Sequence, residues 1–208
     1  MKKALFLCLL FSGELLNAQA PDFSILQVKA PETFRANFKT NKGEFIIEVY
    51  RKWSPLGADR MYQLIKSGFF SNALFFRVEP NFVVQFGISA NYDANRFWDP
   101  RKLADEPALQ KNTKEMISFA RGGRNDRATQ LFINMADNTK LDTAFRNGVK
   151  GYTPFGRVVK GMDVVTGLNG RYGKQPATMQ DSLYKYGNRY FEKAFPGLDK
   201  IISASILK

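Results

Sequence analysis

Hydrophobic and polar residues alternate from Thr33 to Tyr50, on both sides of a short turn sequence. The turn is Asn41-Lys42-Gly43, and glycine tolerates the backbone conformations that tight turns require. The apolar positions of this stretch are Phe34, Ala36, Phe38, Phe45, Ile47 and Val49. Because successive side chains of a strand point to opposite faces, this period of two predicts a β-hairpin with one buried face.

The pattern changes to helical spacing after Trp53. Ser54-Pro55 has the residue types favoured at the N-cap and first position of a helix, and Gly68 is a typical helix end. The apolar residues between these two points recur at three- and four-residue intervals: Ala58, Met61, Tyr62, Leu64 and Ile65. This spacing predicts an amphipathic helix with Ser54 as its N-cap.

Short apolar segments follow, separated by Gly, Asn and Asp. They span residues 74–78, 82–86, 116–120, 130–135 and 154–159. Such a series favours a closed antiparallel barrel or a sandwich, because closure leaves no strand edge unpaired. A second short helix is expected from Met162 to Leu168, and residues 201–206 have the composition of a last strand.

The chain is expected to divide into four parts. Residues 1–20 form a signal peptide, 21–32 a lead-in, 33–170 the main domain, and 171–208 a C-terminal extension that packs on the barrel or completes it. Composition changes at the last boundary, where Tyr, Lys and Arg become frequent.

The first twenty residues have the order of a secretory signal peptide. Two lysines at positions 2 and 3 precede an apolar run over 4–11, and the motif Ala18-Gln19-Ala20 follows as a cleavage site. The alternative for this segment is a buried N-terminal helix. No later stretch reaches the ~20 apolar residues that span a bilayer. We therefore expect an exported protein, periplasmic or secreted.

Histidine is absent from the 208 residues, and Cys8 is the single cysteine. The absence of His excludes Ser-His-Asp and Cys-His triads and His-ligated zinc. One Cys excludes an intrachain disulfide, and this Cys would leave with the signal peptide. No metal or other cofactor is expected, so any catalysis must use Arg, Lys, Tyr, carboxylates, amides or the shape of a pocket.

The chain carries 31 Lys and Arg residues against 19 Asp and Glu residues, a formal charge of +12. This charge raises nucleic acid and anionic membrane surfaces as partners. The basic residues are dispersed, however, and no nucleic-acid-binding motif accompanies them. We expect no specific nucleic-acid partner.

Two segments place polar side chains next to aromatic ones. By strand alternation, Phe75 and Arg77 share one face in the first segment, and Gln130 and Phe132 share one face in the second. A guanidinium with carboxamides and aromatic rings suits binding of an apolar side chain while the backbone beside it is hydrogen-bonded. Taken singly, such an Arg is more often solvated and such Phe residues are more often core.

Three groups of motifs follow one another in the chain. They are Phe75-x-Arg77-x-x-Pro80-x-Phe82-x-x-Gln85, then Ala120-Arg121-Gly122-Gly123 with Thr129-Gln130-Leu131-Phe132-Ile133, then Leu141-Asp142 with Phe155-Gly156-x-Val158. Their order resembles the cyclophilin family of peptidyl-prolyl cis-trans isomerases, from about Thr33 to Leu168. The resemblance implies a mainly β fold: a closed eight-stranded antiparallel barrel capped by two helices, here with a C-terminal extension.

The resemblance also implies a substrate groove on the outside of the barrel. Its catalytic residues would be Arg77, Phe82 and Gln85, with Gln85 supporting the arginine and the peptide backbone. Its substrate-binding residues would be Val83, Ala120, Arg121, Gln130, Phe132, Leu141 and Tyr152. Phe82, Val83, Phe132 and Leu141 would line the proline pocket, and Ala120 and Arg121 would contact the peptide through their main chain.

Two positions depart from the family pattern. Lys140 stands where an aromatic residue is common, and Tyr152 occupies a pocket position that is often His. These replacements weigh against cyclosporin binding but leave the isomerisation residues in place. The segment 89–110, with Trp98 and Pro100, does not map onto the family.

The sequence thus predicts an exported, monomeric peptidyl-prolyl isomerase that acts on proline-containing polypeptides and assists their folding. The alternative is a catalytically weak module of the same fold that only holds proline-containing segments. The presence of Arg77, Phe82, Gln85 and Phe132 favours the enzyme. Because isomerisation makes and cuts no bond, it requires no nucleophile or metal, which suits a chain without His.

Overall fold

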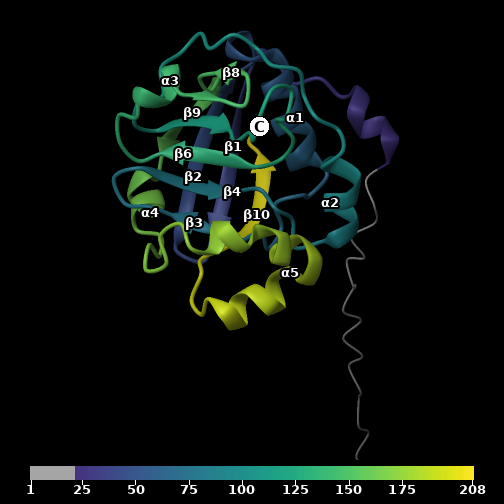
Figure 1. Ribbon diagram of the computed structural model, residues 1–208. Coiled ribbons are helices and arrows are strands. Elements are labelled where there is room, and N and C mark those ends of the chain that lie inside the picture. Colours follow the sequence, from purple (N-terminus) through teal and green to yellow (C-terminus); the bar gives the residue numbers. More distant parts are fainter. Residues whose placement is uncertain (1–21) are drawn as a thin grey trace, which may run out of the picture.

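One curled antiparallel sheet organises the protein (Figure 1). The computed structural model describes residues 22–208, and the signal peptide expected at 1–20 lies outside this range. The eight strands of the sheet are β1 (Thr33–Thr40), β2 (Gly43–Tyr50), β3 (Arg77–Val78), β4 (Val83–Phe86), β5 (Met116–Phe119), β6 (Leu131–Asn134), β9 (Pro154–Lys160) and β10 (Ile201–Ile206). Their spatial order is β10-β1-β2-β9-β5-β6-β4-β3. A separate hairpin pairs β7 (Phe145–Arg146) with β8 (Val149–Lys150).

The sheet forms a half-barrel whose edge strands are β10 and β3. One isolated bridge, between Leu74 and Lys200, joins the chain just before β3 to the chain just before β10. Beside it, the Phe75 N–H donates to the Asp199 carbonyl over 2.9 Å. The expected antiparallel, mainly β class is confirmed, whereas a continuous ladder closed into a barrel is not.

The predicted hairpin is confirmed in β1 and β2. Phe38 pairs with Phe45 across the turn, and Gly43 has the positive φ of 131° that favours glycine. The Phe38 and Phe45 rings stack with centroids 5.1 Å apart and are fully buried. The period of two in the sequence therefore corresponds to one face packed on the core.

Helices cover the sheet from several sides. They are α1 (Pro55–Lys66), α2 (Tyr92–Trp98), α3 (Lys140–Thr143), α4 (Met162–Thr166) and α5 (Gln180–Ala194), with 3-10 turns η1 (Phe23–Gln27), η2 (Arg51–Trp53) and η3 (Pro176–Met179). The two expected helices are α1, packed against β9 and β10, and α4, packed against β2. Within residues 22–208, no helix is long and apolar enough to cross a membrane.

The sheet carries hydrophobic clusters on both faces. The main core fills the inside of the curl with residues such as Phe38, Phe70, Phe86, Phe119 and Phe155. A second cluster, called here the α5 cluster, joins α5 to the segments beside β3 and β4. Its buried members are Leu74, Phe76, Ile88, Leu183, Phe191, Phe195 and Leu198.

Phe75 and Arg77 do not share a face, contrary to the sequence prediction. Phe75 is fully buried in the main core, with its ring 5.4 Å from that of Phe86, whereas the Arg77 side chain is 27% exposed. The reason is that the β3 ladder begins only at Arg77. Residues 74–76 lie outside it, so strand alternation does not extend back to Phe75.

A remote carboxylate, not Ser54, satisfies the amide groups at the start of α1. Ser54 is the N-cap residue, but its side chain makes no capping hydrogen bond and instead donates to Glu106. Glu106 accepts from the N–H groups of Leu56, at 2.8 Å, and Gly57, at 3.2 Å. It also binds the Arg127 guanidinium at 2.9 Å, where the Arg127 side chain is buried and the Glu106 side chain is 10% exposed. Glu106 thus ties α1 to the loop before β6.

Replacing Glu106 by Ala should strongly destabilise the fold. Because the buried Arg127 cation would lose its counter-charge, we expect the free energy of unfolding to fall by about 3–5 kcal/mol in urea titrations. The matched control is Glu32→Ala: Glu32 is 82% exposed and lies 3.6 Å from Arg51. That exposed pair should contribute less than about 1 kcal/mol. Equal losses in the two variants would contradict this assignment.

Candidate active site

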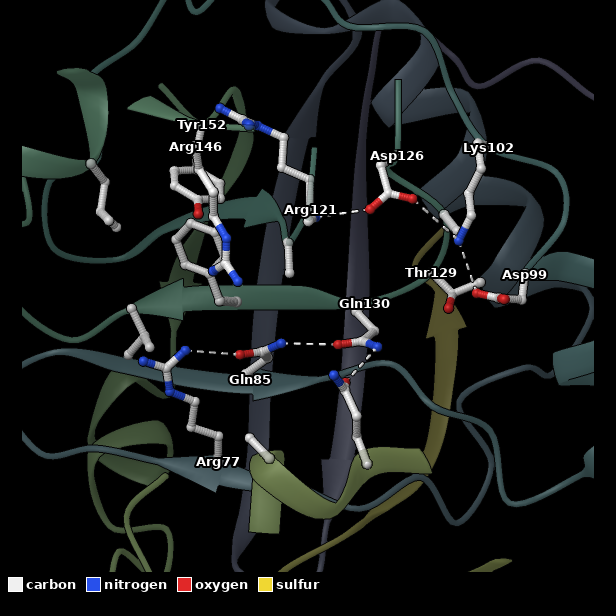
Figure 2. A pocket seen from close by; sticks show the side chains of 18 of the residues that line it. Arg77, Gln85, Asp99, Lys102, Arg121, Asp126, Thr129, Gln130, Arg146 and Tyr152 are labelled. Atoms are coloured by element: carbon white, nitrogen blue, oxygen red, sulfur yellow. Dashed lines mark hydrogen bonds and ion pairs between the residues drawn. The ribbon is translucent and has the colours of Figure 1, made fainter. Parts of the chain in front are cut away.

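A cavity of about 530 Å³ opens on the face of the sheet opposite the main core. Figure 2 shows most of the side chains that line it. All ten site residues predicted from the sequence lie on its wall: Arg77, Phe82, Val83, Gln85, Ala120, Arg121, Gln130, Phe132, Leu141 and Tyr152. Residues separated by up to 75 positions in the sequence are thereby brought to one groove.

Strand register sets the centre of the groove. Arg77 on β3 lies opposite Gln85 on β4, and Gln85 lies opposite Phe132 on β6. Directly paired residues of antiparallel strands project to the same face. The guanidinium, the carboxamide and the aromatic ring therefore form one row across three strands.

A line of hydrogen bonds runs along the polar side of the groove (Figure 2). Arg77 Nη1 donates to Gln85 Oε1 over 3.1 Å, and Gln85 Nε2 donates to Gln130 Oε1 over 2.9 Å. At the Arg77 end of this line of hydrogen bonds, Arg77 Nε donates to Glu79 Oε1. Within residues 22–208, Arg77 Nη2 has no hydrogen-bond partner, so its donors are available to a bound molecule.

Beside this polar line lies an apolar pocket. Val83 and Phe132 are 3% and 5% exposed, although neither belongs to the main core. The Phe132 and Tyr152 rings meet edge to face, with centroids 5.4 Å apart. The Arg77 guanidinium carbon lies 5.3 Å from the centre of the Phe82 ring. A cation is thus held at the rim of a pocket that excludes water from its floor.

The backbone after β5 forms another wall. The Ala120 N–H donates to the Gln130 carbonyl over 2.9 Å, so this donor is already used within the protein. In the described part of the chain, the Arg121 N–H and carbonyl have no such partner. The Arg121 side chain turns away, lies 4.7 Å from the Tyr152 ring centre and binds the Gly151 carbonyl. Burial lowers the pKa of this guanidinium.

The far end of the groove is charged. Lys102 lies between two carboxylates, 3.1 Å from Asp99 and 3.6 Å from Asp126 (Figure 2). All three side chains are between 35% and 48% exposed, so the group is open to solvent. Among the described residues, no group of three or more His, Cys, Asp and Glu side chains is arranged to hold a metal ion.

Sequence reasoning missed half of the cavity wall. The residues not anticipated are Asp99, Lys102, Gly122, Asp126, Ala128, Thr129, Arg146, Ala177, Gln180 and Tyr184. Gly122 and Thr129 belong to recognised motifs, which could have indicated them. Ala177, Gln180 and Tyr184 come from the C-terminal segment, where no motif was apparent.

Comparisons with known proteins agree with this geometry. The family described as cyclophilin type peptidyl-prolyl cis-trans isomerase/CLD matches residues 35–185. A peptidyl-prolyl cis-trans isomerase of Acinetobacter baylyi is 38% identical over 129 residues, covering 61% of this chain and 67% of that protein. Peptidyl-prolyl cis-trans isomerase A of Dickeya dadantii is 34% identical over 126 residues, covering 60% and 65%.

Solved structures show the same fold. A cyclophilin type isomerase of Cryptosporidium parvum superposes with a TM-score of 0.61 at 18% identity, covering 85% of this chain and 98% of that one. A second structure of that protein, in the presence of the dipeptide Ala-Pro, gives 0.60 at the same identity. By sequence match, fold and residue placement, the chain belongs to the cyclophilin-type peptidyl-prolyl cis-trans isomerase family.

Proposed function

We propose that the groove catalyses rotation about X-Pro bonds of exported proteins and so assists their folding, with Arg77 as the catalytic residue. The observation that carries this proposal is the single row of Arg77, Gln85 and Phe132, which places a cation beside an apolar pocket. The presence of Ala-Pro with a structural neighbour supports proline-containing segments as the substrate class.

The barrier to be lowered is electronic. Amide resonance gives the peptide bond partial double-bond character, and rotation costs roughly 18–20 kcal/mol. As the amide twists, conjugation is lost and the lone pair returns to the prolyl nitrogen. A donor from the Arg77 guanidinium would stabilise that lone pair more strongly in the twisted state than in the planar one, which is what catalysis requires.

The magnitudes show that Arg77 cannot act alone. Uncatalysed exchange takes about 100 s, and shortening it to about 10 ms requires roughly 5.5 kcal/mol. One hydrogen bond to a charged group contributes about 1.5–3 kcal/mol. The remainder must come from the pocket, which holds the proline ring and keeps water away from the twisting amide.

The other groove residues would fix the two sides of the rotating bond. Phe82, Phe132 and Leu141 would hold the pyrrolidine ring, which leaves the preceding carbonyl to turn. The Arg121 N–H and carbonyl, which have no partner within residues 22–208, would pair with the peptide backbone. Gln85 would keep the guanidinium in place. These roles need no proton transfer.

Export is supported by the order of residues 1–20 and by the position of Cys8 within them. A mature chain without Cys avoids mispairing in an oxidising compartment. A folding isomerase in that compartment would meet unfolded, proline-containing chains directly after their translocation.

Replacing Arg77 should abolish most of the activity. In a peptide isomerisation assay, we expect Arg77→Ala to lower kcat/KM by about ten- to a hundredfold, the equivalent of one charge-assisted hydrogen bond. Arg77→Lys should also be impaired, because the planar donor fork is lost. The control is Arg35→Ala, since the Arg35 side chain is 60% exposed on β1. Full activity of Arg77→Ala would refute the site, and an inactive wild type would indicate the binding module.

Activity should not vary between about pH 6 and 9. The sequence has no His, the reference pKa of a free carboxyl side chain is near 4, and burial raises the pKa of Tyr184, a groove residue, above its ordinary value near 10. A raised tyrosine pKa means that the hydroxyl stays protonated throughout this range. We therefore expect a flat profile of kcat/KM. A bell-shaped or stepped profile in this interval would show that a titrating group takes part.

Secretion should leave a chain that begins at Pro21. N-terminal sequencing of the protein recovered from outside the cytoplasm tests this, with Ala18→Glu as a variant that disrupts the A-x-A motif. We expect the unaltered chain to be cleaved and the variant to retain residues 1–20. Recovery of the wild type only in the cytoplasm, with its first residues intact, would contradict export.

A further inference from the structure

The first turns of α5 lie across one end of the groove. Gln180 and Tyr184 are four residues apart, so they project from the same side of the helix, and both line the cavity. In Figure 2 the dashed line from Gln130 continues toward this helix. The α5 segment is therefore part of the groove and not only a cover for the sheet.

Both donors of the Gln130 carboxamide point to α5. Gln130 Nε2 donates to Gln180 Oε1 over 2.9 Å and to Tyr184 Oη over 3.2 Å. A carboxamide nitrogen has two N–H groups, so these contacts use both. The oxygen of the same group, Oε1, must then face the opposite way, where it accepts from Gln85 Nε2.

All hydrogen bonds from Arg77 to α5 run in one donor-to-acceptor direction. A carboxamide has almost the same shape when its oxygen and nitrogen are exchanged, so its hydrogen-bond partners decide the orientation. If Gln130 were flipped, its Nε2 would meet the donor Nε2 of Gln85. Flipping Gln85 as well would turn a donor toward Arg77, which has donors only. Arg77 therefore sets the orientation of Gln85 and Gln130, and the α5 oxygens are the acceptors that satisfy the Gln130 Nε2 donors in that orientation.

The position of α5 is well determined by its packing. Leu183 and Phe191 are almost fully buried against Leu74 and Phe76 in the α5 cluster. Asn188 Nδ2 donates to the Asn72 carbonyl over 2.6 Å. The helix can thus present Gln180 and Tyr184 at fixed positions without being ordered by a substrate.

We propose that Gln180 and Tyr184 are positioning residues that orient the catalytic guanidinium of Arg77 through Gln130 and Gln85. The inference rests on the proposed function, because it assigns these residues a role in the same reaction. Their hydrogen bonds go to Gln130, which lies two carboxamides away from the Arg77 guanidinium. Their effect should therefore appear in kcat, whereas KM should change little.

Four variants on α5 test this role in the full chain. Tyr184→Phe removes one acceptor but keeps the ring in its cluster, and Gln180→Ala removes the other. Each should lower kcat by about three- to tenfold, the equivalent of one neutral hydrogen bond. Gln180→Glu retains an acceptor oxygen and should remain close to wild type. Tyr186→Phe is the matched control, because Tyr186 is 54% exposed on the same helix.

A double-mutant cycle separates positioning from general damage. In a Gln85→Ala background the hydrogen bonds that join Arg77 to Gln130 are already missing, so Tyr184→Phe should cause no further loss of kcat. The same fold-loss in both backgrounds would overturn the inference, as would a Gln180→Glu variant no more active than Gln180→Ala.

A readout without substrate distinguishes this inference from the proposed function. The Nε–H NMR signal of Arg77 should shift or broaden in Tyr184→Phe and stay unchanged in Tyr186→Phe. If Arg77→Ala keeps full activity, the proposed function fails whatever this signal does. If Arg77→Ala is inactive but the signal and kcat are unchanged in Tyr184→Phe, the α5 inference alone fails.

Discussion

The register of β4 between β3 and β6 is the constraint on which the groove depends. It pairs Gln85 with Arg77 on one side and with Phe132 on the other. A slip of one residue would turn Gln85 into the main core and expose Val84 or Phe86, which are fully buried. The hydrophobic packing inside the curl therefore determines which side chains meet on its outer face. Stability of the core and geometry of the site are two consequences of one pairing.

The C-terminal segment also joins core packing to the groove. The α5 cluster buries Leu74 and Phe76 beside the short strand β3, at the end of the sheet that is not closed by a continuous ladder. Its helix also supplies the two acceptors for Gln130. One element thus covers the edge of the sheet and binds the carboxamide of Gln130 in the groove. A helix outside the recognised motifs therefore forms part of the groove wall.

Different parts of the structure were predictable to different degrees, for physical reasons. β1 and β2 are eight residues long each, so their period of two is visible in the sequence. β3 has two residues, which is too short for any period, so strand alternation predicts the wrong face for Phe75. The groove residues were found through ordered motifs, because strand pairing and not sequence proximity brings them together.

Long-range contacts account for most of what was missed. The carboxylate at the start of α1 comes from Glu106, about fifty positions away, and no local pattern indicates it. In α5, Gly187 has φ 69° and ψ −173°, a non-helical conformation that interrupts the helical spacing between Leu183 and Phe191. An amphipathic pattern broken in this way resembles a loop. The residues of α5 that line the groove can therefore be identified only from the folded structure.

The central question for this protein is whether the groove catalyses rotation about the prolyl bond or only binds the proline-containing segment. Two-dimensional exchange NMR on a peptide containing Ala-Pro, with a catalytic amount of the wild-type protein, distinguishes the two. We predict cross-peaks between the cis and trans resonances at mixing times of about 100 ms, far shorter than the tens of seconds of uncatalysed exchange. Shifted or broadened peptide resonances without cis-trans cross-peaks would show binding without catalysis and would contradict the account.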